Sequence, residues 1–435
     1  MTWNFHNYYI DRDTGLMGQL VLADSEKESL KGLRQIVRER TRDVFNEAKQ
    51  LVELSKKYGS ATLFRIEFLG TNFKYLKLRD QLTLADLIME LNDDLKAEFL
   101  KLKPRFWTQG SFSYDTLNRP YRTPPQEMDI DDGTYLPMQF FDDKPAIGHT
   151  LLLLLVDASL SSLAAENADW TFEAKETCGR IKIPARNVHI DVPMYAIPYD
   201  KFLEKEVLIE KSESYKYSAE AFDSAIADEA QQAQYERIDR DCVNLAVRKD
   251  NVKWIISDPK DVELWFKEAC RRNGPHLRKI CRFLKAWRDA VEWETSGPSS
   301  ISLMAAIVEV VDSTELDTKD FGSMMLTIAK KLPNIFYNGV DSPDPNDERP
   351  LFPPFHEHED KHQEAMKKLE ELISSLELAF AAKTKEDALR ILNSEYGDRV
   401  VDKNLIVPQE AAPAYEKVPM KAESSTTISK SMKSA

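Results

Sequence analysis

Three aspartates in this chain have the spacing expected of a metal site for phosphoryl chemistry. Asp129 and Asp131 are separated by one residue in the apolar run QEMDIDDGTYLPM, and Asp191 lies in a second such run, HIDVPM. Residues two apart in a strand share a face, so Asp129 and Asp131 point the same way while Ile130 and Asp132 point to the other face. Carboxylates gathered on a buried sheet face repel one another unless a cation lies between them, and such hard oxygen ligands suit Mg²⁺. The pattern predicts a magnesium site.

A Gly-Ser pair, Gly110 and Ser111, precedes these acids where a loop enters a predicted helix. Backbone N–H groups at such a point can hold phosphate oxygens. Two Mg²⁺ ions on the three acids could activate an attacking hydroxyl and neutralise a triphosphate leaving group. A lone D-x-D motif also fits a solvated strand face, and a lone Gly-Ser pair also fits a turn. The acids and the loop together favour nucleotidyl transfer.

Alternating and helical patterns predict the elements that carry these residues. A long helix is expected over residues 25–57, with Ser25 and Glu28 as a capping box, and further helices over 82–100 and about 149–165. Besides the run that carries Asp129, the predicted strands are TFEAKETCGRIKIP, NVHIDVPMYAIP and the hairpin pair VNLAVR and VKWII. Residues 203–240 are expected to form a helical insertion.

The fold class predicted from these elements is α+β. Strands occur before about residue 260, and almost everything after 261 has helical periodicity. We therefore expect a catalytic lobe over residues 1–260, long N-terminal helix included, and a helical lobe over 261–405 that closes a nucleotide cleft. Residues 406–435 have too little apolar content to fold and should form a flexible tail.

Composition excludes several classes of protein. The 435 residues carry a net charge of −14, which argues against binding a long polynucleotide through a general basic field. The four cysteines form no CxxC pair, and the first residues lack a secretory signal, so we expect a cytoplasmic protein. The apolar run 151–156 is too short to span a membrane, and we interpret it as part of a buried core helix.

Two other groups of residues suggest chemistry at first sight. His356, His358 and His362 in HEHEDKH resemble a transition-metal site, but the segment is acidic and lacks cysteine, so an exposed loop is expected. The serines of SLSSL, in the predicted core helix, have no histidine and acid partner nearby, so hydrolase chemistry has no support.

Several stretches resemble the cGAS/DncV-like nucleotidyltransferases of bacteria. The resemblance covers residues 1 to about 355. The matching segments are MTWNFHNYY, RTRDVF, PRFWTQGSFSYDTLNRP, QEMDIDDGTYLPM, TCGRIKI, HIDVPMYAIP, HLRKICRFLKAWRDA, GPSSISLMAA and LFPP. It implies a polymerase-β-like core with a mixed sheet. It also implies an enzyme that joins ATP and GTP into 3′,3′-cyclic GMP-AMP, a second messenger of antiphage defence, and releases pyrophosphate. A template-independent transferase on RNA ends and a silent nucleotide sensor or scaffold are the alternatives.

The resemblance also implies roles for particular residues. Asp129, Asp131 and Asp191 match the catalytic, metal-holding positions. The positions that match nucleotide contacts are Gln109, Gly110, Ser111, Arg180, Lys285, Ser300 and Asp347. Lys285 shares a predicted helix face with Arg278 and Arg282, and this basic face could meet phosphate or simply be solvated.

Two further segments carry hypotheses about regulation and partners. Arg34, Arg38 and Arg42 recur at intervals of four, which is typical of a solvated helix face. With Arg105 and Trp107 from the matched segment they could instead form a site for an anionic or aromatic regulator. Because relatives in antiphage systems are encoded beside a ubiquitin-activating-like partner, resemblance also suggests conjugation of the tail through Ala435.

Overall fold

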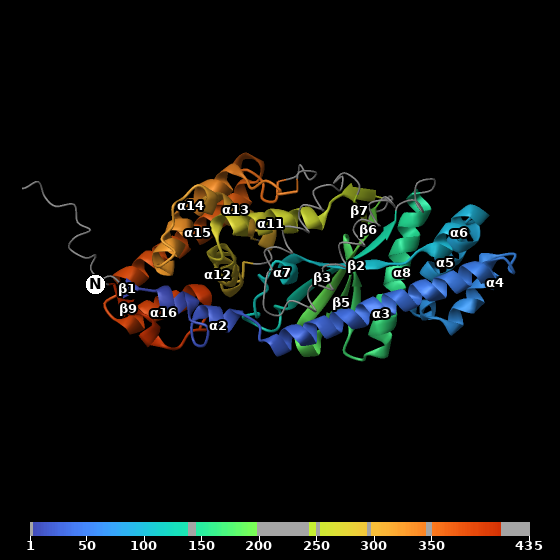
Figure 1. Ribbon diagram of the computed structural model, residues 1–435, viewed down its shortest axis with the longest axis horizontal. Coiled ribbons are helices and arrows are strands. Elements are labelled where there is room, and N and C mark those ends of the chain that lie inside the picture. Colours follow the sequence, from blue (N-terminus) through green and yellow to red (C-terminus); the bar gives the residue numbers. More distant parts are fainter. Residues whose placement is uncertain are drawn as a thin grey trace, which may run out of the picture.

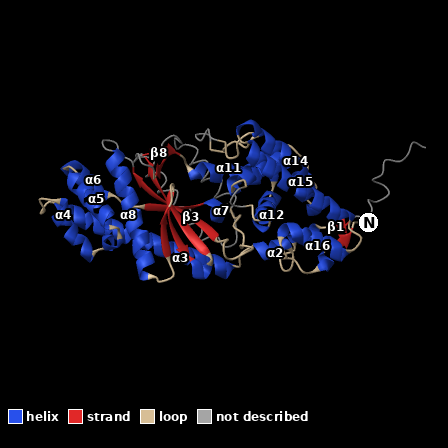
Figure 2. Ribbon diagram, turned by 180° about the vertical axis from the view of Figure 1, so that it is seen from behind, coloured by secondary structure: helices blue, strands red, loops and turns tan. Residues whose placement is uncertain are grey.

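The protein is an elongated molecule with one mixed sheet in the middle and helices at both ends. The computed structural model describes residues 3–137, 145–197, 243–248, 253–293, 297–344 and 350–409. Figure 1 shows the sheet elements between a helical C-terminal region and a group of helices formed by residues 61–101. Figure 2 shows the strands, in red, enclosed between these helical groups. This arrangement confirms the predicted α+β class with a mixed sheet.

Seven strands form the sheet within the described residues, in the order β2-β3-β6-β5-β4, with β7 beside β6 and β8 beside β7. Their bounds are β2 (Arg105–Gln109), β3 (Met128–Pro137), β4 (Thr171–Ala174), β5 (Cys178–Ile183), β6 (Val188–Ile197), β7 (Asn244–Val247) and β8 (Lys253–Ile256). Strands β3 and β6 are parallel and the other neighbours are antiparallel. In the β3–β6 register Asp131 pairs with Asp191, so two of the predicted acids lie side by side.

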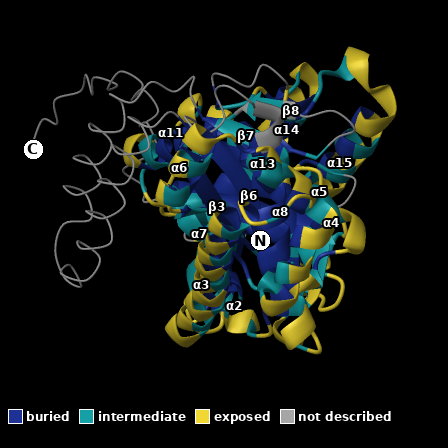
Figure 3. Ribbon diagram, turned by 90° about the vertical axis from the view of Figure 1, so that its right-hand side faces the viewer, coloured by how far each residue is buried: buried dark blue, intermediate teal, exposed yellow. Residues whose placement is uncertain are grey.

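Two long helices cover one face of the sheet. The predicted N-terminal helix is α3 (Asp24–Ser55), and α8 (Pro145–Glu166) packs between it and the strands. Helix α8 is long and apolar enough to cross a bilayer by composition, yet it lies mostly buried inside the protein. Figure 3 shows it in the buried centre of the molecule, while α3 exposes its outer face. Residues 151–156 therefore belong to a core helix, as predicted.

Two local predictions about these helices are wrong. The residue before the first turn of α3 is Ala23, whose N–H donates to Glu26 at 2.6 Å, so Ser25 and Glu28 do not form the capping box. The helix expected over 82–100 is two helices, α5 (Leu78–Glu90) and α6 (Asp93–Lys101). Asn92 separates them because its side chain accepts the Leu95 N–H and starts a new helix. Short helices precede α5: α4 (Ala61–Phe64), η1 (Arg65–Gly70) and η2 (Asn72–Tyr75).

The C-terminal region is built from helices around a separate apolar core. These helices are α11 (Pro259–Asn273), α12 (His276–Ala290), α13 (Ser300–Asp312), α14 (Phe321–Asn338), α15 (Glu359–Ala381) and α16 (Lys385–Tyr396), with short turns η6 (Phe355–Glu357) and η7 (Lys403–Leu405). The boundary at residue 260 stays a prediction. The expected insertion over 203–240 and the tail lie outside the described residues, apart from residues 406–409.

The first residues of the chain pack with this helical region rather than with the catalytic lobe to which the domain prediction assigns them. The elements concerned are β1 (Trp3–Asn4), α1 (His6–Ile10) and α2 (Leu16–Leu20). Strand β1 pairs with β9 (Val407–Pro408), and the Trp3 indole donates to the Ala382 carbonyl oxygen at 2.8 Å. Apolar side chains of α1 and α2 join the core of helices α12 to α16.

The three histidines of HEHEDKH do not all lie in an exposed loop. His356 is exposed in η6, but His362 lies in α15 with no exposed surface, and its Nε2 donates to the Pro353 carbonyl oxygen at 2.6 Å. The loop prediction therefore fails for His362, because the helix begins at Glu359 and its spacing turns His362 toward the core. The chain uses this imidazole for packing.

Candidate active site

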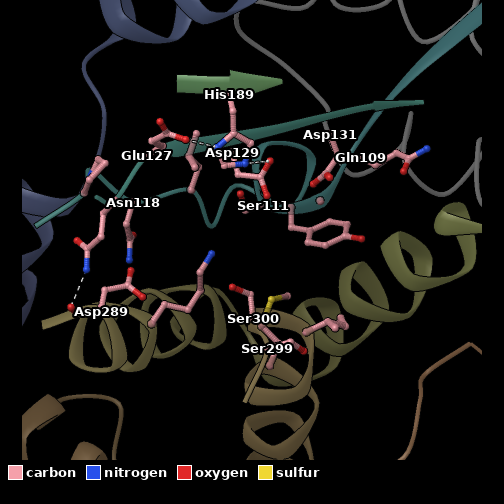
Figure 4. Close-up of a pocket in the computed structure, with 18 of the residues that line it drawn as sticks. Gln109, Ser111, Asn118, Glu127, Asp129, Asp131, His189, Asp289, Ser299 and Ser300 are labelled. Carbon is pink, nitrogen blue, oxygen red and sulfur yellow. Dashed lines mark hydrogen bonds and ion pairs between the residues drawn. The ribbon is translucent and has the colours of Figure 1, made fainter. Parts of the chain in front are cut away.

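A cavity of about 830 Å³ lies between the strands and helices α12 and α13 (Figure 4). Its volume is within the range of about 300–1,000 Å³ typical of small-molecule sites. The residues predicted to act on nucleotides that line it are Gln109, Gly110, Ser111, Asp129, Asp131, Arg180, Lys285 and Ser300. Asp191 lies beside them through its contact with Arg180, and Asp347 lies outside the described residues. Segments more than 150 residues apart thus meet at one cavity.

The Gly-Ser loop turns sharply from β2 into the short helix α7 (Gly110–Ser113). Gly110 has φ +65°, a left-handed conformation that favours glycine. A Cβ at this position would collide with Asp131 Oδ2, so the loop backbone lies directly against this carboxylate. Gln109 is fixed beneath it, because its amide donates to Tyr135 Oη at 2.9 Å and accepts from Tyr195 Oη at 3.3 Å.

The three acids lie close enough together to affect the protonation of Asp131. Arg180 donates two hydrogen bonds to Asp191, at 2.6 and 2.7 Å. Burial, followed by the charges of Asp129 and Asp191, raises the pKa of Asp131 well above its usual 3.8. The alternation predicted for β3 is borne out, because Ile130 is buried in the core and Asp132 pairs with α3 on the opposite face. The cavity therefore attracts a cation.

His189 also belongs to this group, and the sequence analysis did not single it out. On β6 it lies two residues before Asp191, and its Nε2 is 2.9 Å from Asp129 Oδ1. Its Nδ1 is 2.9 Å from Glu127 Oε2, and Figure 4 shows the ring between these two carboxylates. Burial works to lower the pKa of His189, but the contact with Asp129 outweighs it and raises the pKa above 6.5. The alternation in HIDVPM, which places His189 on the face of Asp191, was the signal that could have revealed it.

The donor set fits a divalent metal ion. Asp129, His189 and Asp191 each offer a ligand atom, and these atoms lie within 4.8 Å of one another. Asp129 Oδ1 and His189 Nε2 are buried without an aligned hydrogen-bond partner in the part of the chain that the structure describes. Buried polar atoms left in this state are costly unless something binds them. A metal ion held by oxygens of the acids would satisfy this cluster.

On the opposite wall, α12 contributes a buried lysine. Lys285 Nζ donates to the Thr116 carbonyl oxygen at 2.9 Å, in the loop that follows α7. Burial, with the neighbouring Arg288 charge, lowers the pKa of Lys285 to about 8. The sequence predicted that Lys285 and Arg282 share one basic face of α12, but only Lys285 lines the cavity. Arg282 is instead buried against the same loop, where it donates to the Leu117 carbonyl oxygen and to Asp115.

Helix α13 begins at the cavity and presents two serines to the strands (Figure 4). Ser299 caps this helix by accepting the Ser302 N–H at 3.1 Å. Ser300 Oγ accepts a hydrogen bond from Arg288 Nη1 at 3.2 Å. Both side chains lie across the cavity from Asp129 and Asp131.

The arginines of α3 lie on the other face of β2. Arg38 makes a bidentate contact with the buried Asp132 at 2.6 and 2.7 Å, and Arg42 lies over the Phe106 ring, 4.9 Å from its centroid. Arg34 donates to Thr108 at 2.5 Å. Strand alternation places Arg105 and Trp107 on the opposite face of β2, where the Trp107 indole donates to Glu263 at 3.3 Å. The structure therefore divides the five residues between the two faces of β2, and their regulatory role stays a prediction.

Fold and site together define a nucleotidyltransferase: a mixed sheet that places acids beside a Gly-Ser loop and opposite a basic helix. Residues 104–195 match the family described as "Cyclic GMP-AMP synthase DncV-like, nucleotidyltransferase domain". Residues 274–409 match "Cyclic GMP-AMP synthase, C-terminal domain". The chain is 53% identical to a cyclic GMP-AMP synthase of Vibrio cholerae, over 99% of both chains. It is 48% identical to one of Escherichia coli, again over 99% of both. The chain therefore belongs to the DncV-like nucleotidyltransferase family and is an enzyme, as the resemblance implied.

Solved structures of Vibrio cholerae DncV share this fold. The complex with the linear intermediate 5′ pppA(3′,5′)pG has a TM-score of 0.83 and 52% identity, and the match covers 94% of this chain and 100% of that one. The complex with GTP and 5MTHFGLU2 has a TM-score of 0.84 with the same identity and coverage.

Proposed function

We propose that this enzyme joins ATP and GTP into 3′,3′-cyclic GMP-AMP in two metal-dependent nucleotidyl transfers. The observation that carries the proposal is the cavity itself, where Asp131, crowded by two further acids, lies opposite Lys285 and beside the Gly110 turn. The Vibrio cholerae relative has been solved with a linear pppApG intermediate, which is the product of one such transfer. An RNA-end transferase would need a basic path for the polynucleotide, and the net charge of −14 argues against it.

In each transfer, the 3′-hydroxyl oxygen of one nucleotide gives up its proton to solvent and forms a bond to the α-phosphorus of the other. The bond between the α- and β-phosphates breaks and releases pyrophosphate. Asp129, Asp131 and Asp191 would hold two Mg²⁺ ions, which lower the barrier by stabilising the attacking and leaving oxygens. Lys285 and Arg180 offer positive charge for the triphosphate, and the backbone at Ser111 offers N–H donors. The linear dinucleotide is then bound again in reverse orientation for the second bond.

The test is incubation of the purified enzyme with ATP, GTP and Mg²⁺, followed by mass spectrometry and digestion with a 3′,5′-specific phosphodiesterase. A cyclic product cleaved at both linkages is expected, and Asp129→Asn should abolish it while the protein stays folded. A parallel reaction with a short RNA tests the transferase alternative. Extension of that RNA without a cyclic product would refute the proposal, and absence of any turnover would favour the silent sensor.

We further propose that the enzyme acts in the cytoplasm in antiphage defence, without membrane or long nucleic acid. A ubiquitin-activating-like partner would conjugate its tail through Ala435, which lies outside the described residues. Deletion of the last residues should leave synthesis intact and block attachment to a lysine of another protein. Conjugation of the truncated chain would contradict this.

A regulatory role for the α3 arginines is also proposed. Their support is the contact between Arg38 and Asp132, because Asp132 is the neighbour of Asp131 in β3. An anion that engages Arg34 and Arg42 beside this pair could therefore act on the strand that carries a catalytic acid. Because the Vibrio cholerae relative has been solved with 5MTHFGLU2, that compound is the first candidate to test. If this compound changes the rate of the wild-type enzyme, Arg42→Ala should weaken that change, and an unchanged response would remove the basis of this role.

A further inference from the structure

We propose that His189, held in place by Glu127, positions the carboxylate of Asp129 for metal binding. The inference deepens the proposed function, since it rests on metal-dependent transfer at the same cavity. It concerns a residue outside the predicted metal triad.

The register of the sheet places the histidine beside its target. Asp129 of β3 and His189 of β6 are direct partners in the parallel pair, so their side chains leave the sheet side by side on the cavity face. The Nε2 to Asp129 Oδ1 distance is 2.9 Å. On the other side of the ring, Nδ1 lies 2.9 Å from Glu127 Oε2. The three side chains thus form a carboxylate–imidazole–carboxylate chain.

The three side chains of this group differ in burial. The side chain of His189 is 11% exposed and that of Glu127 21%, whereas that of Asp129 is 44% exposed. Packing therefore holds the ring more firmly than it holds the Asp129 carboxylate, for which the contact with His189 is the constraint. Asp191, by comparison, is already oriented by two hydrogen bonds from Arg180. His189 supplies for Asp129 the orientation that Arg180 supplies for Asp191.

The same geometry indicates that His189 positions a metal ligand and is not itself an additional ligand. Both ring nitrogens already lie against carboxylate oxygens, Nδ1 at hydrogen-bond distance from Glu127 and Nε2 in ion-pair contact with Asp129. Mg²⁺ prefers oxygen ligands, which Asp129 provides. Groups that orient metal ligands in this way typically contribute about 10–100-fold to metal affinity.

The experiment measures binding of Mn²⁺, as a paramagnetic substitute for Mg²⁺, by electron paramagnetic resonance of the full-length protein without nucleotide. His189→Ala should weaken Mn²⁺ binding by about 10–100-fold. His189→Gln, which keeps one N–H donor, should recover part of the loss, and Glu127→Gln should weaken binding less than His189→Ala. The matched control is Arg186→Ala, an exposed residue in the turn before β6, which should bind Mn²⁺ like the wild type.

A rate measurement separates positioning from loss of a ligand. At saturating Mn²⁺, His189→Ala should regain most of the wild-type rate, whereas Asp129→Asn should not. Wild-type Mn²⁺ affinity in folded His189→Ala would overturn the inference, and if that variant does not fold, unchanged affinity in Glu127→Gln would overturn it. A wild-type protein that binds Mn²⁺ but makes no cyclic dinucleotide would instead refute the proposed function and leave the role of His189 intact.

Discussion

Gly110→Ala tests whether the loop backbone and the catalytic acid are fitted to each other. The left-handed φ of +65° at Gly110 would cost an alanine roughly 1–2 kcal/mol. The new Cβ would also lie under 3.0 Å from Asp131 Oδ2, closer than real Cβ atoms come. The carboxylate would have to retreat by about 1 Å, and a displacement of that size costs on the order of 100-fold in rate. We expect kcat to fall about 100-fold and Tm to fall by about 2–8 °C.

The assay follows pyrophosphate release under saturating ATP, GTP and Mg²⁺, beside thermal unfolding of the same preparations. Gly32→Ala is the matched control, because Gly32 lies in α3 and its added Cβ would meet nothing within 4 Å. That variant should keep full activity and gain about 0.5–1 kcal/mol of stability. A Gly110→Ala enzyme with near wild-type kcat would refute the reasoning that Asp131 is positioned against the loop.

Three further predictions concern charge. Asp131→Asn should abolish synthesis yet stabilise the metal-free protein. Because the pKa of Asp131 is raised, the native state keeps a proton that the unfolded chain loses above about pH 3.8, and this costs the wild type stability. The gain in Tm of Asp131→Asn over the wild type, measured in EDTA, should therefore grow as pH rises from about 4. If Lys285 contacts the triphosphate, kcat/KM should fall as pH rises through about 8, the pKa of this lysine. Lys285→Arg keeps its charge at this pH and should remove the fall. Arg38→Ala should cost about 3–5 kcal/mol in chemical denaturation by leaving Asp132 buried and unpaired, and adding Asp132→Leu should recover much of that loss.

The sequence was enough to predict the catalytic strand β3, because the face on which each of its side chains lies depends only on the alternation of adjacent residues. Alternation alone placed Asp129 and Asp131 on one face and Ile130 and Asp132 on the other. The same reasoning failed over 82–100, where apolar periodicity continues across Asn92 although its side chain caps a new helix. A cap is one side-chain hydrogen bond, and the surrounding pattern does not reveal whether it forms.

Local sequence patterns could not predict contacts between residues that are far apart in the chain. Arg38 lies 94 residues from Asp132, and Arg282 lies 165 residues from the Leu117 carbonyl that it contacts. From the sequence, Arg38 belonged to a solvated helix face and Arg282 to a face that could meet phosphate. The way the helices pack on the rest of the protein decides which of these charges is buried, and the sequence pattern does not contain that information. His189 was missed for a related reason, since its contact with Asp129 depends on the pairing of two strands about 60 residues apart.

The pairing of β1 with β9 brings the first and last described strands of the chain side by side. Trp3 and Asn4 lie opposite Pro408 and Val407, at the pole of the molecule occupied by α16, whereas α7 and β3 lie near its middle (Figure 1). Joining residues 4 and 407 by a short linker would therefore leave the fold continuous, and new ends could be opened in a surface loop elsewhere. A circularly permuted enzyme of this kind should remain active.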